Sequence, residues 1–164
     1  MSKTLDTKEV WDILKEIPDP EIPVISIIDL GVVRNVELNG TNAIVTITPT
    51  YSGCPAMKQM EDDIVKLLKQ KGFESVEVIT TYTPAWTTDW LNNEAKERLK
   101  QYGIAPPEHS TSDKSILLGK EKKVTCPRCG SIHTQLVSQF GSTACKALYQ
   151  CKDCLEPFDY FKCI

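Results

Sequence analysis

Two Cys-x-x-Cys pairs near the C-terminus constrain the fold of this chain more than any other feature of its sequence. The first pair is Cys126 and Cys129, and the second is Cys151 and Cys154. Two thiolates on a tight turn can reach one tetrahedral zinc ion, and a second such turn completes a closed shell of four sulfurs. The two pairs are about 21 residues apart, which a hairpin accommodates. We therefore expect these cysteines to hold a structural zinc in a β-rich zinc ribbon over residues 122–164.

Other interpretations of the cysteines stay open from the sequence alone. Iron in a rubredoxin-like site, or a cluster, would use the same thiolates, and four unligated core cysteines are a further alternative. Cys145 and Cys163 lie outside the pairs; each is a small buried residue, a substitute ligand or a thiol that meets a partner. His109 and His133 are isolated in the sequence, and we expect both at the surface.

Composition limits the classes of protein to consider. The N-terminus has acidic residues where a signal peptide would be apolar, and no apolar run approaches the roughly 18 residues of a membrane span. We expect a cytoplasmic protein with reduced thiols, which favours metal ligation over disulfides. Residues 120–164 carry seven Lys/Arg and four Asp/Glu, and zinc-bound thiolates would offset that excess. We therefore expect neither a nucleic-acid partner nor a membrane partner.

Hydrophobic periodicity divides the rest of the chain into helices and strands. Asp6 or Thr7 is a suitable cap for the first helix, prolines at 18, 20 and 23 require a loop, and Asn39-Gly40 is a strong hairpin signal. The expected elements are a helix at 7–17, strands at 32–38 and 42–50, a helix at 55–71 closed by Gly72, a strand at 75–82 and a helix between Pro84 and Gly103. The predicted fold class is α+β: a small α-β-β-α-β-α domain at 1–103, a linker at 104–121 and the zinc ribbon at 122–164.

Cys54 is the residue of the first domain that we expect to carry chemistry. It lies between the end of a predicted strand and the first turn of the helix predicted from Pro55. Amide groups at a helix N-terminus lower the pKa of a thiol, which makes it a better metal ligand or nucleophile. Asp19, Glu21 and Asp29 precede it and can converge on it. The alternative for Cys54 is a buried cysteine that only contributes to packing. The alternative for the three carboxylates is that they are solvated or cap the loop.

The motifs of this domain resemble the MIP18-type family of iron–sulfur assembly factors. The matching runs are 19–23 (DPEIP), 26–33 (SIIDLGVV) and 48–55 (TPTYSGCP), and the resemblance covers about 7–103. It implies a small α/β fold in which Cys54 handles iron–sulfur clusters, or binds their acceptors. It also implies that Asp19, Glu21, Asp29 and Thr48 occupy the family's acidic and polar positions.

The runs at 140–149 (FGSTACKALY) and 156–162 (EPFDYFK) are similar to the family of D subunits of phenylacetyl-CoA epoxidase systems. That resemblance implies an accessory or maturation factor in phenylacetate degradation, with the system's reductase and oxygenase subunits as partners. It implies structural zinc and either transient iron or a transient iron–sulfur cluster as cofactors. The alternative is a non-catalytic structural subunit of the oxygenase complex. The chain has no carboxylate/His di-iron motif, so we do not expect it to be catalytic by itself. A homodimer is compatible with either role.

Overall fold

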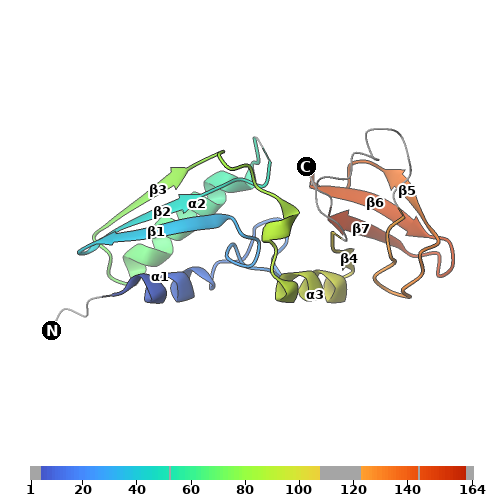
Figure 1. The fold of residues 1–164 in the computed structure, drawn as a ribbon, viewed down its shortest axis with the longest axis horizontal. Helices are drawn as coiled ribbons and strands as arrows, with labels where there is room; N and C mark the ends of the chain where they lie inside the picture. The colour runs from blue at the N-terminus through green and yellow to red at the C-terminus, as the bar shows by residue number, and fades with distance from the viewer. Residues whose placement is uncertain (1–4, 52, 108–122, 144, 162–164) are drawn as a thin grey trace. The chain divides into compact units, whose positions relative to one another are not determined.

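The computed structural model describes residues 5–51, 53–107, 123–143 and 145–161 of the 164-residue chain. Two compact units follow one another along it, Met1–Trp86 and Thr87–Ile164. Their elements follow the predicted α-β-β-α-β-α order and then form a β-rich unit, which confirms the α+β class (Figure 1). Among the described residues, no helix is both long and apolar enough to cross a bilayer. The domain limits at 103 and 121 stay a prediction, because most of the expected linker lies outside the described residues.

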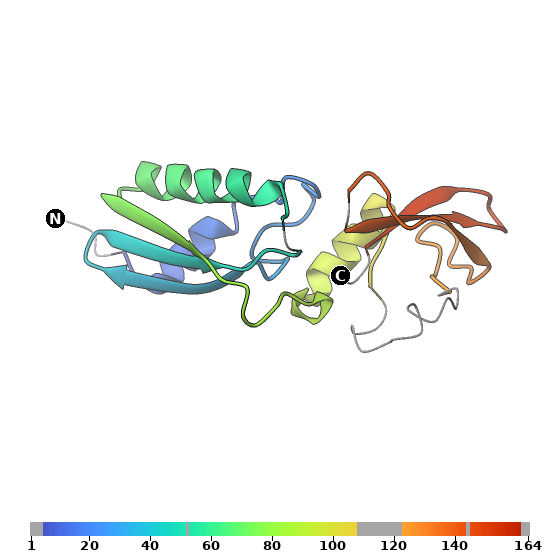
Figure 2. The ribbon, with the colours of Figure 1, turned by 90° about the horizontal axis from the view of Figure 1, so that it is seen from above.

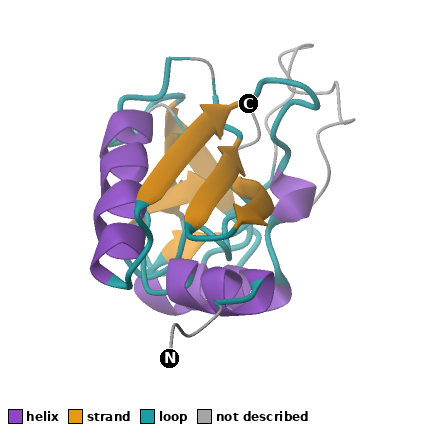
Figure 3. Ribbon diagram, turned by 90° about the vertical axis from the view of Figure 1, so that its left-hand side faces the viewer, coloured by secondary structure: helices purple, strands orange, loops and turns teal. Residues whose placement is uncertain are grey.

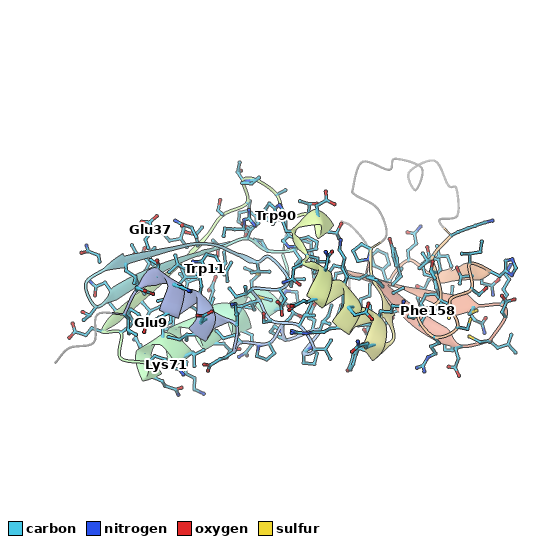
Figure 4. All side chains as sticks on the ribbon, turned by 60° about the horizontal axis from the view of Figure 1, so that its bottom comes forward. Glu9, Trp11, Glu37, Lys71, Trp90 and Phe158 are labelled. Atoms are coloured by element: carbon cyan, nitrogen blue, oxygen red, sulfur yellow. The ribbon has the colours of Figure 1, made fainter. Side chains whose placement is uncertain are left out.

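Helix α1 (Thr7–Leu14) begins at Asp6, one of the two predicted caps. The Asp6 carboxylate accepts from the Glu9 amide at 2.7 Å, and the Glu9 carboxylate accepts from the Asp6 amide at 3.2 Å. This reciprocal pair is a capping box. Glu9 is labelled on the helix in Figure 4. The helix ends three residues before the predicted position, because the chain there turns into the proline-containing loop.

A three-stranded sheet in the order β1-β2-β3 is the centre of the first unit. Strands β1 (Val33–Asn39) and β2 (Asn42–Ile47) form the predicted antiparallel hairpin, and Gly40 takes the positive φ of 64° that its turn requires. Strand β3 (Ser75–Thr80) pairs with β2 in parallel. The parallel pairing requires a crossover connection, which helix α2 (Ala56–Gln70) provides.

Helices α1 and α2 pack on one face of this sheet. Helix α1 contacts β1, α2 contacts β3, and the two helices contact each other (Figures 1 and 2). Along α2 the buried residues Met60, Ile64 and Leu68 recur at helical spacing, as predicted. Figure 3 shows α2 running alongside the strands. The β2–α2 connection, which contains Cys54, therefore joins two packed elements.

The second unit begins with helical turns where the sequence predicts one continuous helix. The structure has a short 3₁₀ helix η1 (Thr88–Trp90) and a separate α3 (Asn93–Tyr102), which is capped by the Asn92 side chain 2.7 Å from the Ala95 amide. Trp86 lies before both helices, is buried, and donates its indole N–H to the Leu30 carbonyl at 2.9 Å within the first unit. The prediction of one continuous helix was therefore wrong, because the apolar residues at 86–99 belong to more than one element.

A four-stranded sheet in the order β4-β7-β6-β5 forms most of the second unit. Strand β4 (Ile104–Ala105) comes from the expected linker and pairs in parallel with β7 (Pro157–Phe161), while β6 (Lys146–Cys151) pairs antiparallel with β7 and β5 (Thr134–Ser138). Figure 4 marks Phe158 on β7, where it stacks on Tyr149 with ring centroids 6.0 Å apart. The core of this unit includes Cys126 and Cys151, so two of the predicted zinc ligands are also part of its packing.

Candidate functional site

The four cysteines of the two Cys-x-x-Cys pairs come together in the second unit. Their Sγ atoms all lie within 4.8 Å of one another, and among the described residues they are the one such group of His, Cys, Asp or Glu donors. The Sγ atoms of Cys126 and Cys154 are 3.8 Å apart, and those of Cys129 and Cys151 are 3.5 Å apart. Sulfurs bound at about 2.3 Å around a tetrahedral zinc lie about 3.8 Å apart. The donor set and its spacing therefore fit a zinc ion.

Local hydrogen bonds prepare one of these thiols, Cys151, for a metal. The Cys154 amide approaches Cys151 Sγ at 3.5 Å, and this bond, together with one from the Asp153 amide, lowers the pKa of Cys151 to about 7. Thiolates are the form that binds zinc, so amides that stabilise a thiolate favour metal binding. A closed shell of four thiolates leaves no position for a substrate, and the zinc held there would stabilise the fold.

The remaining cysteines and histidines are placed as follows. Cys145 is buried, with its Sγ 3.0 Å from the Thr143 hydroxyl, and does not belong to the four-cysteine group. Among its three interpretations the structure favours a small buried residue. His133 is exposed as expected but is not isolated, because its Nδ1 lies 3.2 Å from the Asp153 carboxylate. Cys163 and His109 lie outside the described residues.

Asp19 organises the proline-containing loop of the first unit. It is only 4% exposed, and its Oδ1 accepts from the amides of Glu21 at 2.9 Å and Ile22 at 2.7 Å. A bridge between Pro18 and Ser26 and a 2.8 Å bond from the Asp19 amide to the Ile25 carbonyl close the loop. The capping alternative for this carboxylate is therefore observed, and its contacts fix the backbone of Glu21.

Asp29 has a similar local role. Its carboxylate accepts from the Ser26 amide at 3.2 Å, and the Ser26 hydroxyl accepts from the Asp29 amide at 3.1 Å. These two reciprocal bonds close a turn immediately before β1. Asp29 therefore orders the chain between the proline-containing loop and the sheet.

Cys54 lies directly before α2, as predicted, but its pKa is shifted in the direction opposite to the prediction. The side chain is 8% exposed, and burial raises the pKa of the thiol above its ordinary value. The negative charge of Glu21 raises it further, while the Ala56 amide at the helix N-terminus and the hydroxyls of Tyr51 and Thr50 act in the other direction. The helix end does stabilise the thiolate, but desolvation outweighs it.

Of the three carboxylates predicted to converge on Cys54, Glu21 is the one whose negative charge raises the pKa of the thiol. Within the described residues, Cys54, Asp19 and Glu21 do not form a preassembled metal-binding group. The sequence-based prediction gave no role to Thr50 and Tyr51, although their position just before Cys54 was a usable signal. Thr48 was matched to a polar family position, and its buried hydroxyl has no hydrogen-bond partner among the described residues.

Comparisons with known proteins agree with this two-part structure. Residues 7–79 match the family described as "Iron-sulfur cluster assembly protein", and residues 110–162 match the "PaaD zinc beta ribbon domain". A crystal structure of a DUF59 domain from Bacillus anthracis is 29% identical with a TM-score of 0.53, covering 56% of this chain and 89% of that one. The conserved hypothetical protein TM0487 from Thermotoga maritima is also 29% identical, with a TM-score of 0.52, covering 60% of this chain and 98% of that one.

Fold and site together define a protein that joins a domain of the iron–sulfur cluster assembly type to a zinc β-ribbon. A relative from Escherichia coli (strain K12), named as the putative D subunit of 1,2-phenylacetyl-CoA epoxidase, is 52% identical over 95% of this chain and 92% of its own length. The chain belongs to this family of phenylacetyl-CoA epoxidase D subunits. The resemblance drawn from the sequence runs is therefore confirmed.

Proposed function

We propose that this protein is an accessory maturation factor of a phenylacetyl-CoA epoxidase system, and that Cys54 transiently holds iron or an iron–sulfur cluster for the reductase or the oxygenase. The observation that carries the proposal is the pairing of a buried thiol, Cys54, with the nearby negative charge of Glu21. A cation between the two would relieve their repulsion as the thiol loses its proton. Other subunits of the system are then the partners, in the cytoplasm.

The incomplete ligand set at Cys54 supports transfer rather than storage. A closed shell of four thiolates holds its metal tightly, as a structural site requires. Cys54 and Glu21 offer one sulfur and one carboxylate, and the remaining coordination positions would be filled by ligands of the client. Asp19 contributes by fixing the backbone that carries Glu21. The zinc ribbon, stabilised by its own metal, would be the surface that docks the client.

Replacing Cys54 by Ser tests the proposal. The variant should remain folded and zinc-loaded but should no longer support cluster insertion into a co-expressed reductase. Cys145→Ser is the matched control, because it makes the same change at a buried cysteine outside both sites. Iron content and electron transfer of the reductase are the readouts. If Cys54→Ser leaves both at the wild-type level, Cys54 has no role in maturation.

A second candidate function is a structural component of the oxygenase complex, in which Cys54 is only a packing residue. The burial of Cys54 favours this alternative, because a thiol with a raised pKa is mostly protonated at neutral pH. Purification of the co-expressed system separates the two functions. A structural component should co-elute with the oxygenase in a fixed ratio, and Cys54→Ser should not alter that ratio. A maturation factor should be absent from the purified complex.

A further inference from the structure

The two zinc knuckles are joined by hydrogen bonds as well as by their thiols. On the backbone, the Ser131 carbonyl accepts from the amide of Cys126 at 2.8 Å, and the His133 carbonyl accepts from the amide of Lys152 at 2.7 Å. The first bond closes the turn of the first knuckle, and the second connects that knuckle's exit to the second knuckle. Ser131 and His133 are thus fixed relative to ligands of both pairs.

Side chains add a second connection. Asp153, which lies between Cys151 and Cys154, accepts a hydrogen bond from the Ser131 hydroxyl through its Oδ2. His133 Nδ1 lies 3.2 Å from that oxygen and 3.4 Å from Oδ1, and the His133 amide donates to the Ser131 hydroxyl at 3.0 Å. The cluster therefore links residues after the first knuckle to a carboxylate inside the second.

The three residue types are those of a nucleophilic triad, but their arrangement is different. In a triad the serine hydroxyl faces the imidazole, which removes its proton. Here Ser131 donates to the carboxylate and accepts from a backbone amide, and the His133 ring also faces the carboxylate. The hydroxyl is bonded to the carboxylate rather than to the imidazole, so the arrangement is suited to holding two turns together rather than to catalysis.

The placement of the cluster matters because one side of the zinc site is open. Cys126 and Cys151 are 0% exposed, whereas Cys129 is exposed to solvent. Cys129 lies two residues before Ser131, so competing ligands would reach the metal beside the bonded cluster. Substituting the residues that hold metal ligands in place commonly lowers metal affinity about 10- to 100-fold.

We propose that Ser131, His133 and Asp153 form a positioning brace that holds the two zinc knuckles at the separation required by the four thiolates and so slows release of the metal. The brace residues do not bind zinc themselves. They act through the turns that present Cys126, Cys129, Cys151 and Cys154. This role is independent of Cys54 and of the proposed maturation function.

Zinc release from the full-length protein to an excess of a colorimetric chelator tests the brace. Ser131→Ala and Asp153→Ala should each release zinc about tenfold faster than wild type. The double variant should be no faster than either single one, because both substitutions remove the same bond. Ser131→Thr keeps the hydroxyl and should behave as wild type. Glu94→Gln is the control, since this exposed carboxylate of the same unit pairs with Arg98 within α3, at 3.7 Å.

Cobalt substitution separates positioning from general stability. The ligand-field bands of Co²⁺ report the geometry of the four thiolates. They should change in Ser131→Ala and Asp153→Ala and stay unchanged in Ser131→Thr and Glu94→Gln. His133→Ala removes the longer contacts and should have the smaller effect. Release rates within about twofold of wild type for both single variants, or effects that simply multiply in the double variant, would overturn the proposal.

Discussion

Cysteine is used in two different environments in this protein. In the second unit, four Sγ atoms lie within 4.8 Å of one another, and the Cys154 and Asp153 amides lower the pKa of Cys151. In the first unit, Cys54 is a single thiol beside one carboxylate and two hydroxyls, and burial raises its pKa. The first environment, with four sulfur donors already grouped, favours a resident metal. The second keeps a protonated thiol that has to lose its proton before it can bind.

The two environments also differ in what holds them together. Cys126 and Cys151 belong to the core of the ribbon, so its packing and its metal site share residues. The proline-containing loop that carries Glu21 is closed by hydrogen bonds to Asp19, and the first unit has a sheet and two helices with an apolar core of their own. Loss of a zinc-binding cysteine should therefore unfold the ribbon and leave the first unit folded.

Replacement of Cys151 by Ala should have the largest effect. The ribbon should lose its zinc and the pairing of β5, β6 and β7, because the free energy of binding a structural zinc, about 10–16 kcal/mol in small zinc-dependent folds, is also folding free energy. The first unit should keep its structure. Zinc stoichiometry and a ¹⁵N–¹H NMR spectrum measure both results, with Cys54→Ser as the matched control that retains zinc. Dispersed signals from residues 123–161 in the zinc-free variant would contradict this dependence.

The ribbon could be predicted from sequence because local spacing determines it. A Cys-x-x-Cys turn places two thiolates near one metal whatever the rest of the chain does, and the Asn39-Gly40 hairpin is equally local. The parallel pairing of β4 with β7 could not be predicted, since it joins Ile104 to Asp159 across more than fifty residues of chain. The division between η1 and α3 was missed because apolar residues of two elements happened to match one helical spacing.

Asp19 should give an intermediate effect. Asp19→Ala leaves the Glu21 and Ile22 amides without their acceptor and should lower the free energy of unfolding of the first unit by about 1.5–3 kcal/mol, the range for hydrogen bonds to charged groups. Asp19→Asn keeps an oxygen acceptor and should lower the free energy of unfolding by a smaller amount. Hydrogen exchange of amides in 7–80 measures both changes.

Asp12→Ala is the control for this series. It removes an exposed partner of Lys15 on α1, and exposed ion pairs contribute about 0–1 kcal/mol. If Asp19→Ala is as stable as this control, the carboxylate does not organise the loop. If Asp19→Asn is stable but fails to support cluster insertion, the negative charge of Asp19 is needed as well as its acceptor oxygen.

The pKa of Cys54 shows where prediction from the sequence reached its limit. The position of a thiol before a helix can be read from residues 54–56, and the Ala56 amide does favour the thiolate. Burial of that thiol depends on packing of the whole first unit, and the approach of Glu21 depends on how the 18–26 loop closes. Both raise the pKa, and neither leaves a local sequence signal.

The smallest effect should be a shift in the pH profile of Cys54 alkylation, measured by peptide mapping of the zinc-loaded protein. Thiolate is the reactive form, so the midpoint should lie above the ordinary thiol value of 9.0. Because the folded-state pKa is raised, the contribution of Cys54 to stability is complete below that pH and is lost as pH rises through the folded-state value. Glu21→Gln removes a negative charge and should lower the midpoint, whereas the exposed Glu16→Gln should not.

A bound divalent cation should act on Cys54 in the same direction as Glu21→Gln, and more strongly. Positive charge beside the thiol stabilises the thiolate, so Fe²⁺ binding should release a proton and should become tighter as pH rises. Glu21→Gln should weaken that binding even though it makes the thiol more acidic, because it removes the second ligand. If the variant instead binds Fe²⁺ more tightly, Glu21 influences Cys54 only through its charge and is not part of a metal-handling pair.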